Sequence, residues 1–90
     1  MCNGVEMSWN TLSEWGTAGY LIYRSEGASF VSAEQVSEEM IMASGGGEYG
    51  LTDASAKAER SYTYWLVEVG VDGREEVVAS VTTTAQGCVR

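Results

Sequence analysis

The chain has 90 residues, of which 44% are hydrophobic, and its 13 acidic and 5 basic residues give a formal net charge of -8. This length fits one small domain covering residues 1–90, and the acidic charge disfavours nucleic acid and anionic membranes as partners, because phosphate groups bind clustered Lys and Arg. The chain has no histidine, the commonest metal ligand and general base, and its two cysteines cannot close a zinc site. We therefore expect a non-enzyme with no catalytic residue, no metal and no cofactor.

Neither membrane insertion nor an export signal is predicted from the sequence. No apolar run approaches the roughly 20 residues that span a bilayer, and the N-terminus lacks a basic region followed by an apolar stretch. If the protein is exported, its signal has been removed or belongs to a longer parent chain.

Alternating apolar and polar residues predict β-strands along the chain. Val5, Met7 and Trp9 alternate with polar residues at the start, and the pair Asp72 and Gly73 predicts a tight turn between two β-rich runs. The predicted strands cover approximately residues 5–10, 19–24, 29–33, 48–53, 61–69 and 74–84. Because turn signals and not helices separate these strands, we expect an all-β antiparallel sandwich of two sheets.

The segment from residue 32 to residue 47 is the ambiguous part of the pattern. Ser32 and Gln35 resemble a helix capping box, and Val36 and Met40 lie at helical spacing. Three glycines at 45–47 then end any regular element. We interpret the segment as a long connection that includes at most one helical turn.

The order of these motifs resembles a fibronectin type III domain, an immunoglobulin-like sandwich. The motifs are V.M.W, GY.IYR, Y.L.D, Y.Y.L..V, the DG hairpin and the Val/Thr strand, and they run from Val5 to Thr84. They are especially similar to the variant in bacterial secreted and surface proteins, which implies an extracellular or cell-surface location. The resemblance implies that Tyr62 is a corner tyrosine whose hydroxyl bonds to nearby backbone. The core residues that it implies are Trp9, Tyr20, Ile22, Tyr62, Tyr64 and Leu66.

The sequence departs from this family at its first strand. The family has a strand before the tryptophan strand, and here only four residues precede Val5. A sandwich without this strand leaves backbone groups and apolar side chains open at one edge. Three explanations remain: the strand belongs to a part of the protein not included in this chain, the sandwich tolerates its loss, or a strand of another chain fills the gap.

The family topology implies that Cys2 and Cys88 lie at the same end of the sandwich. A disulfide between them would close nearly the whole chain into one loop, for which chain entropy gives a stabilisation of about 4 to 5 kcal/mol. Such a bridge would indicate an oxidising compartment. The alternatives are two unpaired thiols or pairing with neighbouring molecules.

Strand alternation, with the strand neighbours that the family resemblance implies, also predicts an apolar outer face on the strands at 19–24 and 61–69. If Tyr20 and Ile22 point inward, Leu21, Tyr23, Trp65 and Val67 point outward on neighbouring strands. Large aromatic side chains of this kind are typical of interface centres. The alternatives are that residues 40–42 fold back over this face as a second small core, or that Trp65 stacks on carbohydrate.

Trp15 lies in a glycine-bearing loop between two predicted strands. Such a loop presents a ring to a ligand, for example a sugar. We expect instead that Trp15 packs over one end of the sandwich.

Three functions follow from this sequence. The first is a non-catalytic structural or interaction module of a bacterial secreted or cell-surface protein, in contact with neighbouring domains of its parent chain. The second is a subunit of an extracellular filament that contacts other copies of itself through strand complementation or through the aromatic face. The third is an accessory carbohydrate-binding module of a hydrolase. We expect the first.

Overall fold

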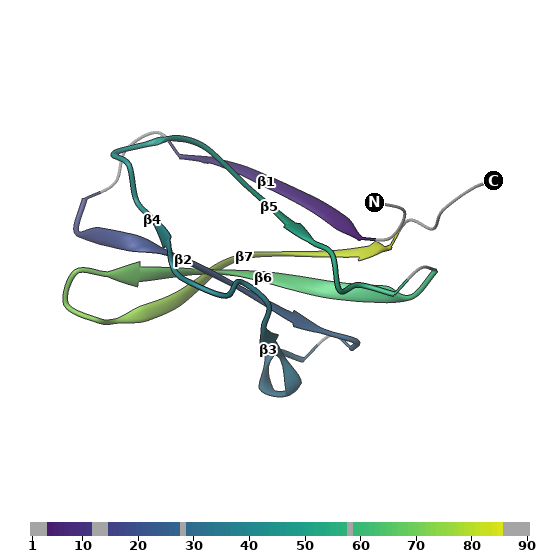
Figure 1. Ribbon diagram of the computed structural model, residues 1–90. Helices are drawn as coiled ribbons and strands as arrows, with labels where there is room; N and C mark the ends of the chain where they lie inside the picture. Colours follow the sequence, from purple (N-terminus) through teal and green to yellow (C-terminus); the bar gives the residue numbers. More distant parts are fainter. Residues whose placement is uncertain (1–3, 12–14, 28, 58, 86–90) are drawn as a thin grey trace.

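The computed structural model describes residues 4–11, 15–27, 29–57 and 59–85, which form two antiparallel β-sheets that pack as a sandwich (Figure 1). The smaller sheet pairs β1 (Val5–Thr11) with β5 (Gly47–Asp53). The larger sheet has the order β3-β2-β6-β7, and β4 also pairs with β2. Its strands are β2 (Thr17–Ser25), β3 (Glu34–Gln35), β4 (Ile41–Met42), β6 (Ser61–Gly70) and β7 (Glu75–Thr84). The predicted all-β sandwich is confirmed.

The core lies between the two sheets. Its fully buried members are Ile22, Ala56, Tyr62, Tyr64 and Ala85. Side chains of β1 at alternating positions pack against this cluster, and the residues between them are exposed, as the period-two pattern predicts. Trp9 and Leu66, which were expected in the core, are partly buried and pack against it.

Three aromatic rings join the two sheets at one place in this core. The ring of Trp9 on β1 stacks on Tyr49 of β5, with centroids 5.6 Å apart. Tyr20 of β2 meets both rings, at 5.7 Å from Trp9 and 5.2 Å from Tyr49. This cluster therefore links the smaller sheet directly to the larger one.

The strand predicted at residues 29–33 is wrong. Residues Phe30–Ser32 form a short 3-10 helix, η1, because serine side chains bond to the local backbone in competition with a strand ladder. Ser29 Oγ accepts a hydrogen bond from the Val31 N–H, and the Ser32 hydroxyl donates to the Ser29 carbonyl. The ring of Phe30 in this turn contacts Tyr23 of β2 and Trp65 of β6.

The helical turn considered after Ser32 is absent, because the two-residue strands β3 and β4 pair with β2 instead. The approach of β4 to β2 explains the glycine at position 19. A Cβ atom there would lie 2.5 Å from the Ile41 carbonyl oxygen and 2.7 Å from Met40 Cγ. Only glycine fits this backbone contact without a shift.

The predicted hairpin between β6 and β7 is present. Gly73 adopts a φ of 88°, and the Gly70 N–H donates to the Arg74 carbonyl at 2.7 Å. β7 then returns along β6, so that its end and the start of β1 lie at the same end of the molecule (Figure 1).

Cys2 and Cys88 lie outside the described residues, and their disulfide stays a prediction. No helix among the described residues is long and apolar enough to cross a membrane.

Candidate functional site

The clearest candidate site is an open edge of the sandwich, formed by β1 and β7. Among the described residues, β1 pairs only with β5, and β7 pairs only with β6. Each strand therefore presents one row of backbone N–H and C=O groups without a partner strand. An open edge at β1 agrees with the sequence, in which no strand pattern precedes Val5.

A cavity of about 180 Å³ lies between these two free edges and reaches the core. Its walls come from both sheets and are mainly apolar. The residues that line it are Met7, Ser8, Trp9, Ile22, Tyr64, Trp65, Leu66, Ala79, Ser80 and Val81. We call this feature the edge groove. Apolar surface that a sandwich normally covers is open to solvent here.

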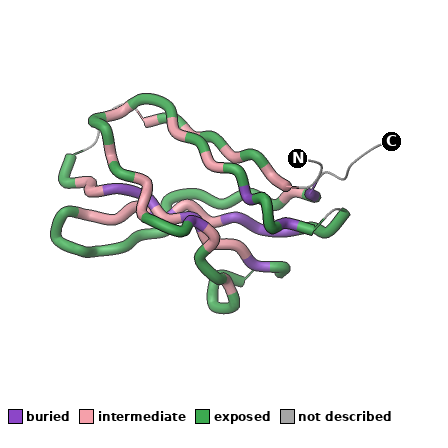
Figure 2. Tube along the Cα trace, viewed as in Figure 1, coloured by how far each residue is buried: buried purple, intermediate pink, exposed green. Residues whose placement is uncertain are grey.

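Strand β7 is exposed along nearly its whole length (Figure 2). Val81, which pairs with the buried Tyr64 and lines the edge groove, is 55% exposed. From Val77 to Thr84 the strand carries no charge and no proline. Seven of these eight residues are Val, Thr or Ala, and the eighth is Ser80. Long, uncharged edge strands of this composition readily pair with further strands.

Trp9 adds a polar atom that lacks a partner. Its indole Nε1 is buried and has no hydrogen-bond acceptor in the described part of the chain. A buried donor left unsatisfied costs about 1 to 3 kcal/mol. The wall of the edge groove is therefore incomplete in its hydrogen bonding as well as in its packing.

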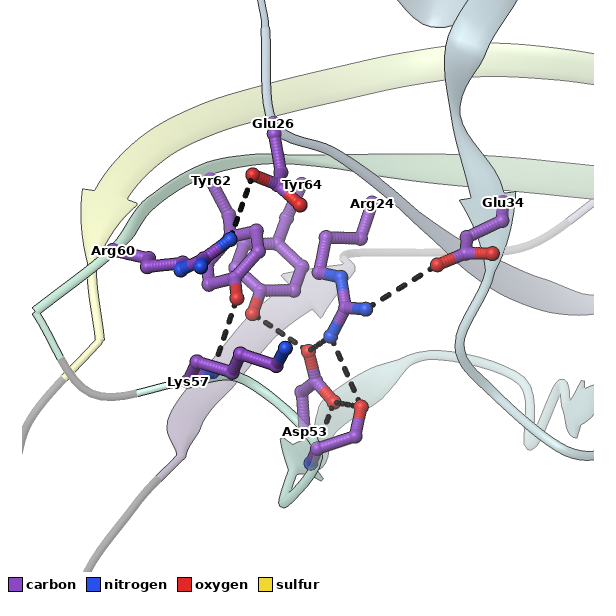
Figure 3. A network of polar contacts seen from close by, with 9 residues as sticks. Arg24, Glu26, Glu34, Asp53, Lys57, Arg60, Tyr62 and Tyr64 are labelled. Carbon is purple, nitrogen blue, oxygen red and sulfur yellow. Dashed lines mark hydrogen bonds and ion pairs between the residues drawn. The ribbon is translucent and has the colours of Figure 1, made fainter.

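A buried polar network joins the two sheets and shares Tyr64 with the lining of the edge groove (Figure 3). Asp53, at the end of β5, accepts hydrogen bonds at 2.7 Å from Arg24 Nη1 on β2 and from the Tyr64 hydroxyl on β6. The other carboxylate oxygen of Asp53 accepts from the backbone N–H and the hydroxyl of Ser55. Arg24 also reaches the exposed Glu34 at 3.3 Å.

The negative charge of Asp53 is stabilised by its partners in this network. Burial alone would raise the pKa of the Asp53 carboxyl, but hydrogen bonds from Ser55, Tyr64 and Arg24 and the charge of Arg24 hold it below its usual value. Burial and the neighbouring Asp53 raise the pKa of the Tyr64 hydroxyl above its usual value. Because both Asp53 oxygens are engaged within the protein, we interpret the network as structural.

The Tyr62 hydroxyl accepts a hydrogen bond from the Lys57 backbone N–H at 3.0 Å. This is the local backbone contact expected of a corner tyrosine. The guanidinium of Arg24 lies 4.8 Å from the centre of the Tyr62 ring, which connects this tyrosine to the polar network. The roles of Arg24 and Asp53 were not predicted, although a charged residue inside a strand pattern was the available signal.

The four residues expected on the outer face lie side by side, and part of their surface is covered. They are Leu21, Tyr23, Trp65 and Val67. The pairing of β2 with β6 sets Leu21 opposite Val67 and Tyr23 opposite Trp65. Val67 is only 2% exposed, so the expectation that it offers contact surface is wrong. It belongs to a central strand with partners on both sides and lies outside the inter-sheet core cluster.

Phe30 of η1 provides the cover on this outer face. Its ring lies 5.3 Å from Tyr23 and 5.5 Å from Trp65 in edge contacts. The Trp65 indole N–H donates to Ser25 Oγ at 3.2 Å. Residues 40–42, the alternative cover considered from the sequence, pair with β2 instead through Ile41 and Met42.

Trp15 is 94% exposed. The expectation that it packs over one end of the sandwich is therefore wrong.

Within the part of the chain that the structure describes, no group of three Asp, Glu, His or Cys residues is placed to hold a metal ion.

Comparisons with models of protein families, with curated proteins and with solved structures found no match to this chain.

Proposed function

We propose that this chain is a non-catalytic structural and interaction module of a bacterial secreted or cell-surface protein, and that it binds a further β-strand at its edge groove. The observation that carries the proposal is that β1 and β7, each with one edge unpaired among the described residues, flank a cavity with apolar walls. A strand added there gains main-chain hydrogen bonds along an edge and buries alternate side chains in the cavity. The added strand comes from a neighbouring domain or protein.

The sheet order and the Tyr62 contact support a fibronectin type III-like module without its first strand. The pairing of β1 with β5, of β2 with β6 and of β6 with β7 matches the strand neighbours of that sandwich. Location outside the cell rests on the resemblance to the bacterial secreted variant. Absence of catalysis is supported by the closed hydrogen bonding of Asp53 and by a sequence without histidine.

Selection of random peptides displayed on phage tests the proposed edge binding. We expect the selected peptides to carry apolar residues at alternate positions, because only one face of an added strand reaches the cavity. Binding should be lost in Val81→Trp, which fills the edge groove, and kept in Val78→Trp. Val78 is a matched control because it lies on the same strand, is 47% exposed and does not line the cavity.

Two outcomes of this selection contradict the proposal. One is the absence of any enriched peptide after repeated rounds against the folded chain. The other is equal binding of the enriched peptides to wild type and to Val81→Trp, since that places their site away from the edge groove.

The exposed ring of Trp15 favours a second candidate function, carbohydrate binding. A ring that is 94% exposed has both faces free for a sugar to stack on, unlike Trp65, which Phe30 partly covers. If this function holds, Trp15→Ala should abolish binding on a glycan array and Trp65→Phe should retain it. Equal glycan binding by wild type and Trp15→Ala would remove this ring as a sugar site.

A further inference from the structure

We infer that the edge groove accepts one extended strand, contributed by another polypeptide segment, in which apolar side chains alternate with lysine or arginine. This inference rests on the proposed function and adds the chemistry of the partner. Four features of the groove carry it: the alternation of β1, the size of the cavity, the charge of the smaller sheet and the unsatisfied indole of Trp9.

The alternation of β1 fixes which residues of an added strand face inward. Val5, Met7 and Trp9 are partly buried, and Glu6, Ser8 and Asn10 are exposed. Side chains on neighbouring strands of a sheet lie on the same face as their direct partners. An added strand therefore needs apolar residues beside the first set and polar residues beside the second.

The cavity has room for the inward-facing side chains. Its volume of about 180 Å³ exceeds the roughly 150 Å³ in which a protein cavity binds a benzene ring. One aromatic or two branched aliphatic side chains fit this space. Filling it also shields Met7 and Val81, which now line an open surface.

The charge of the smaller sheet selects the outward-facing residues. Neither β1 nor β5 contains Lys or Arg, whereas Glu6 and Glu48 are exposed on them. On the other side of the edge groove, β7 begins with the exposed Glu75 and Glu76. Basic residues on an added strand therefore form favourable cross-strand pairs, and acidic ones are repelled.

The same charge disfavours a second copy of this chain as the occupant. Each copy carries a formal net charge of -8, so association of two copies works against electrostatic repulsion. A basic segment of another domain or protein is instead attracted to the acidic sheet. This distinction selects a heterologous partner over a filament of identical subunits.

The indole of Trp9 provides an internal reporter of binding. Its buried N–H lacks an acceptor among the described residues, and an added strand brings carbonyl oxygens to the edge of β1. We expect the Trp9 indole resonance to move downfield when such a strand binds. A peptide that docks elsewhere does not change this hydrogen bond.

The test compares two synthetic peptides by nuclear magnetic resonance titration of the isotope-labelled chain. Both peptides have Val and Leu at alternate positions, with Lys between them in one and Glu in the other. We expect the Lys peptide to bind at least about tenfold more tightly at low salt, which corresponds to about 1.4 kcal/mol. Its binding should shift the Trp9 indole and the β1 amides, disappear in Val81→Trp and persist in Val78→Trp.

Charge reversal at one exposed position provides the matched variant. Glu6→Lys leaves the inward face of β1 unchanged because Glu6 is exposed. It should weaken the Lys peptide and strengthen the Glu peptide relative to wild type. An unchanged preference in this variant would contradict the assigned role of the smaller sheet.

The remaining outcomes separate this inference from the proposed function. Equal affinity of both peptides, with binding still lost in Val81→Trp, overturns the basic partner and leaves strand binding intact. Failure of both peptides, together with no edge-dependent peptide from phage selection, overturns both proposals. A dimer seen by sedimentation for wild type and abolished in Val81→Trp would identify a second copy as the occupant and overturn this inference.

Discussion

Replacing Asp53 with asparagine is expected to lower the free energy of unfolding by about 3 to 5 kcal/mol, which is the usual cost of removing one partner of a buried ion pair. The Asp53 side chain is 3% exposed and that of Arg24 is 15% exposed. The substitution leaves the Arg24 guanidinium with no charged partner in the interior, and it weakens the acceptor of the Tyr64 hydroxyl. Urea denaturation of wild type and Asp53→Asn measures the loss.

Glu34→Gln is the matched control for this substitution. Glu34 is the other carboxylate that reaches Arg24, at 3.3 Å, but its side chain is 73% exposed. Exposed ion pairs contribute at most about 1 kcal/mol. Similar losses for both variants would show that burial of Asp53 does not determine its contribution.

The lowered pKa of Asp53 also gives this contribution a pH dependence. An unfolded aspartate has a pKa of about 3.9, and the pKa of the folded Asp53 carboxyl lies below its usual value. Between these values the unfolded state binds more protons, so stability increases with pH. The contribution of Asp53 is fully present above the unfolded pKa and is lost as the pH falls through the folded pKa. As the pH falls through these two pKa values, Asp53→Asn should therefore lose less stability than wild type does.

The strands of this fold were predictable because their signal is local. Val5, Met7 and Trp9 alternate with polar residues on one strand, and the Asp72 and Gly73 turn connects two neighbours in sequence. An open edge at β1, which pairs only with β5 among the described residues, was expected from the order of the strand patterns. The edge groove lies along this edge, but its size does not follow from the sequence.

Features that depend on the packing of distant segments were not predictable. Arg24 and Asp53 are separated by 29 residues, and only the packing of β2 against β5 brings them together. Phe30 was predicted to lie in a strand because the local pattern is apolar. Its contacts with the rings of Tyr23 and Trp65 depend on the packing of η1 against β2 and β6, which the local pattern does not show. Val67 alternates as an outward residue, but its place in the central strand β6 buries it among its neighbours.

Replacing Tyr20 with alanine is expected to lower the free energy of unfolding by about 3 to 5 kcal/mol, as for other large-to-small changes at buried aromatic positions. Tyr20 is 2% exposed and contacts the rings of Trp9 and Tyr49, which belong to the smaller sheet. Its removal leaves a void at the place where the two sheets are joined. Thermal or urea denaturation measures the effect.

Trp15→Ala is the matched control, because it removes an aromatic side chain that is 94% exposed. Surface changes of this kind alter stability by about 0.5 kcal/mol or less. A loss in Trp15→Ala as large as that in Tyr20→Ala would contradict the assignment of Tyr20 to the junction between the sheets.

The ring junction also connects stability to the proposed binding of a strand. The Trp9 ring forms part of the wall of the edge groove, and Tyr20 supports that ring from the opposite sheet. If Tyr20→Ala remains folded at low temperature, its edge groove should bind the Lys peptide more weakly than wild type does, because the wall is no longer held in one position. Unchanged affinity in the folded variant would show that the groove does not depend on this junction.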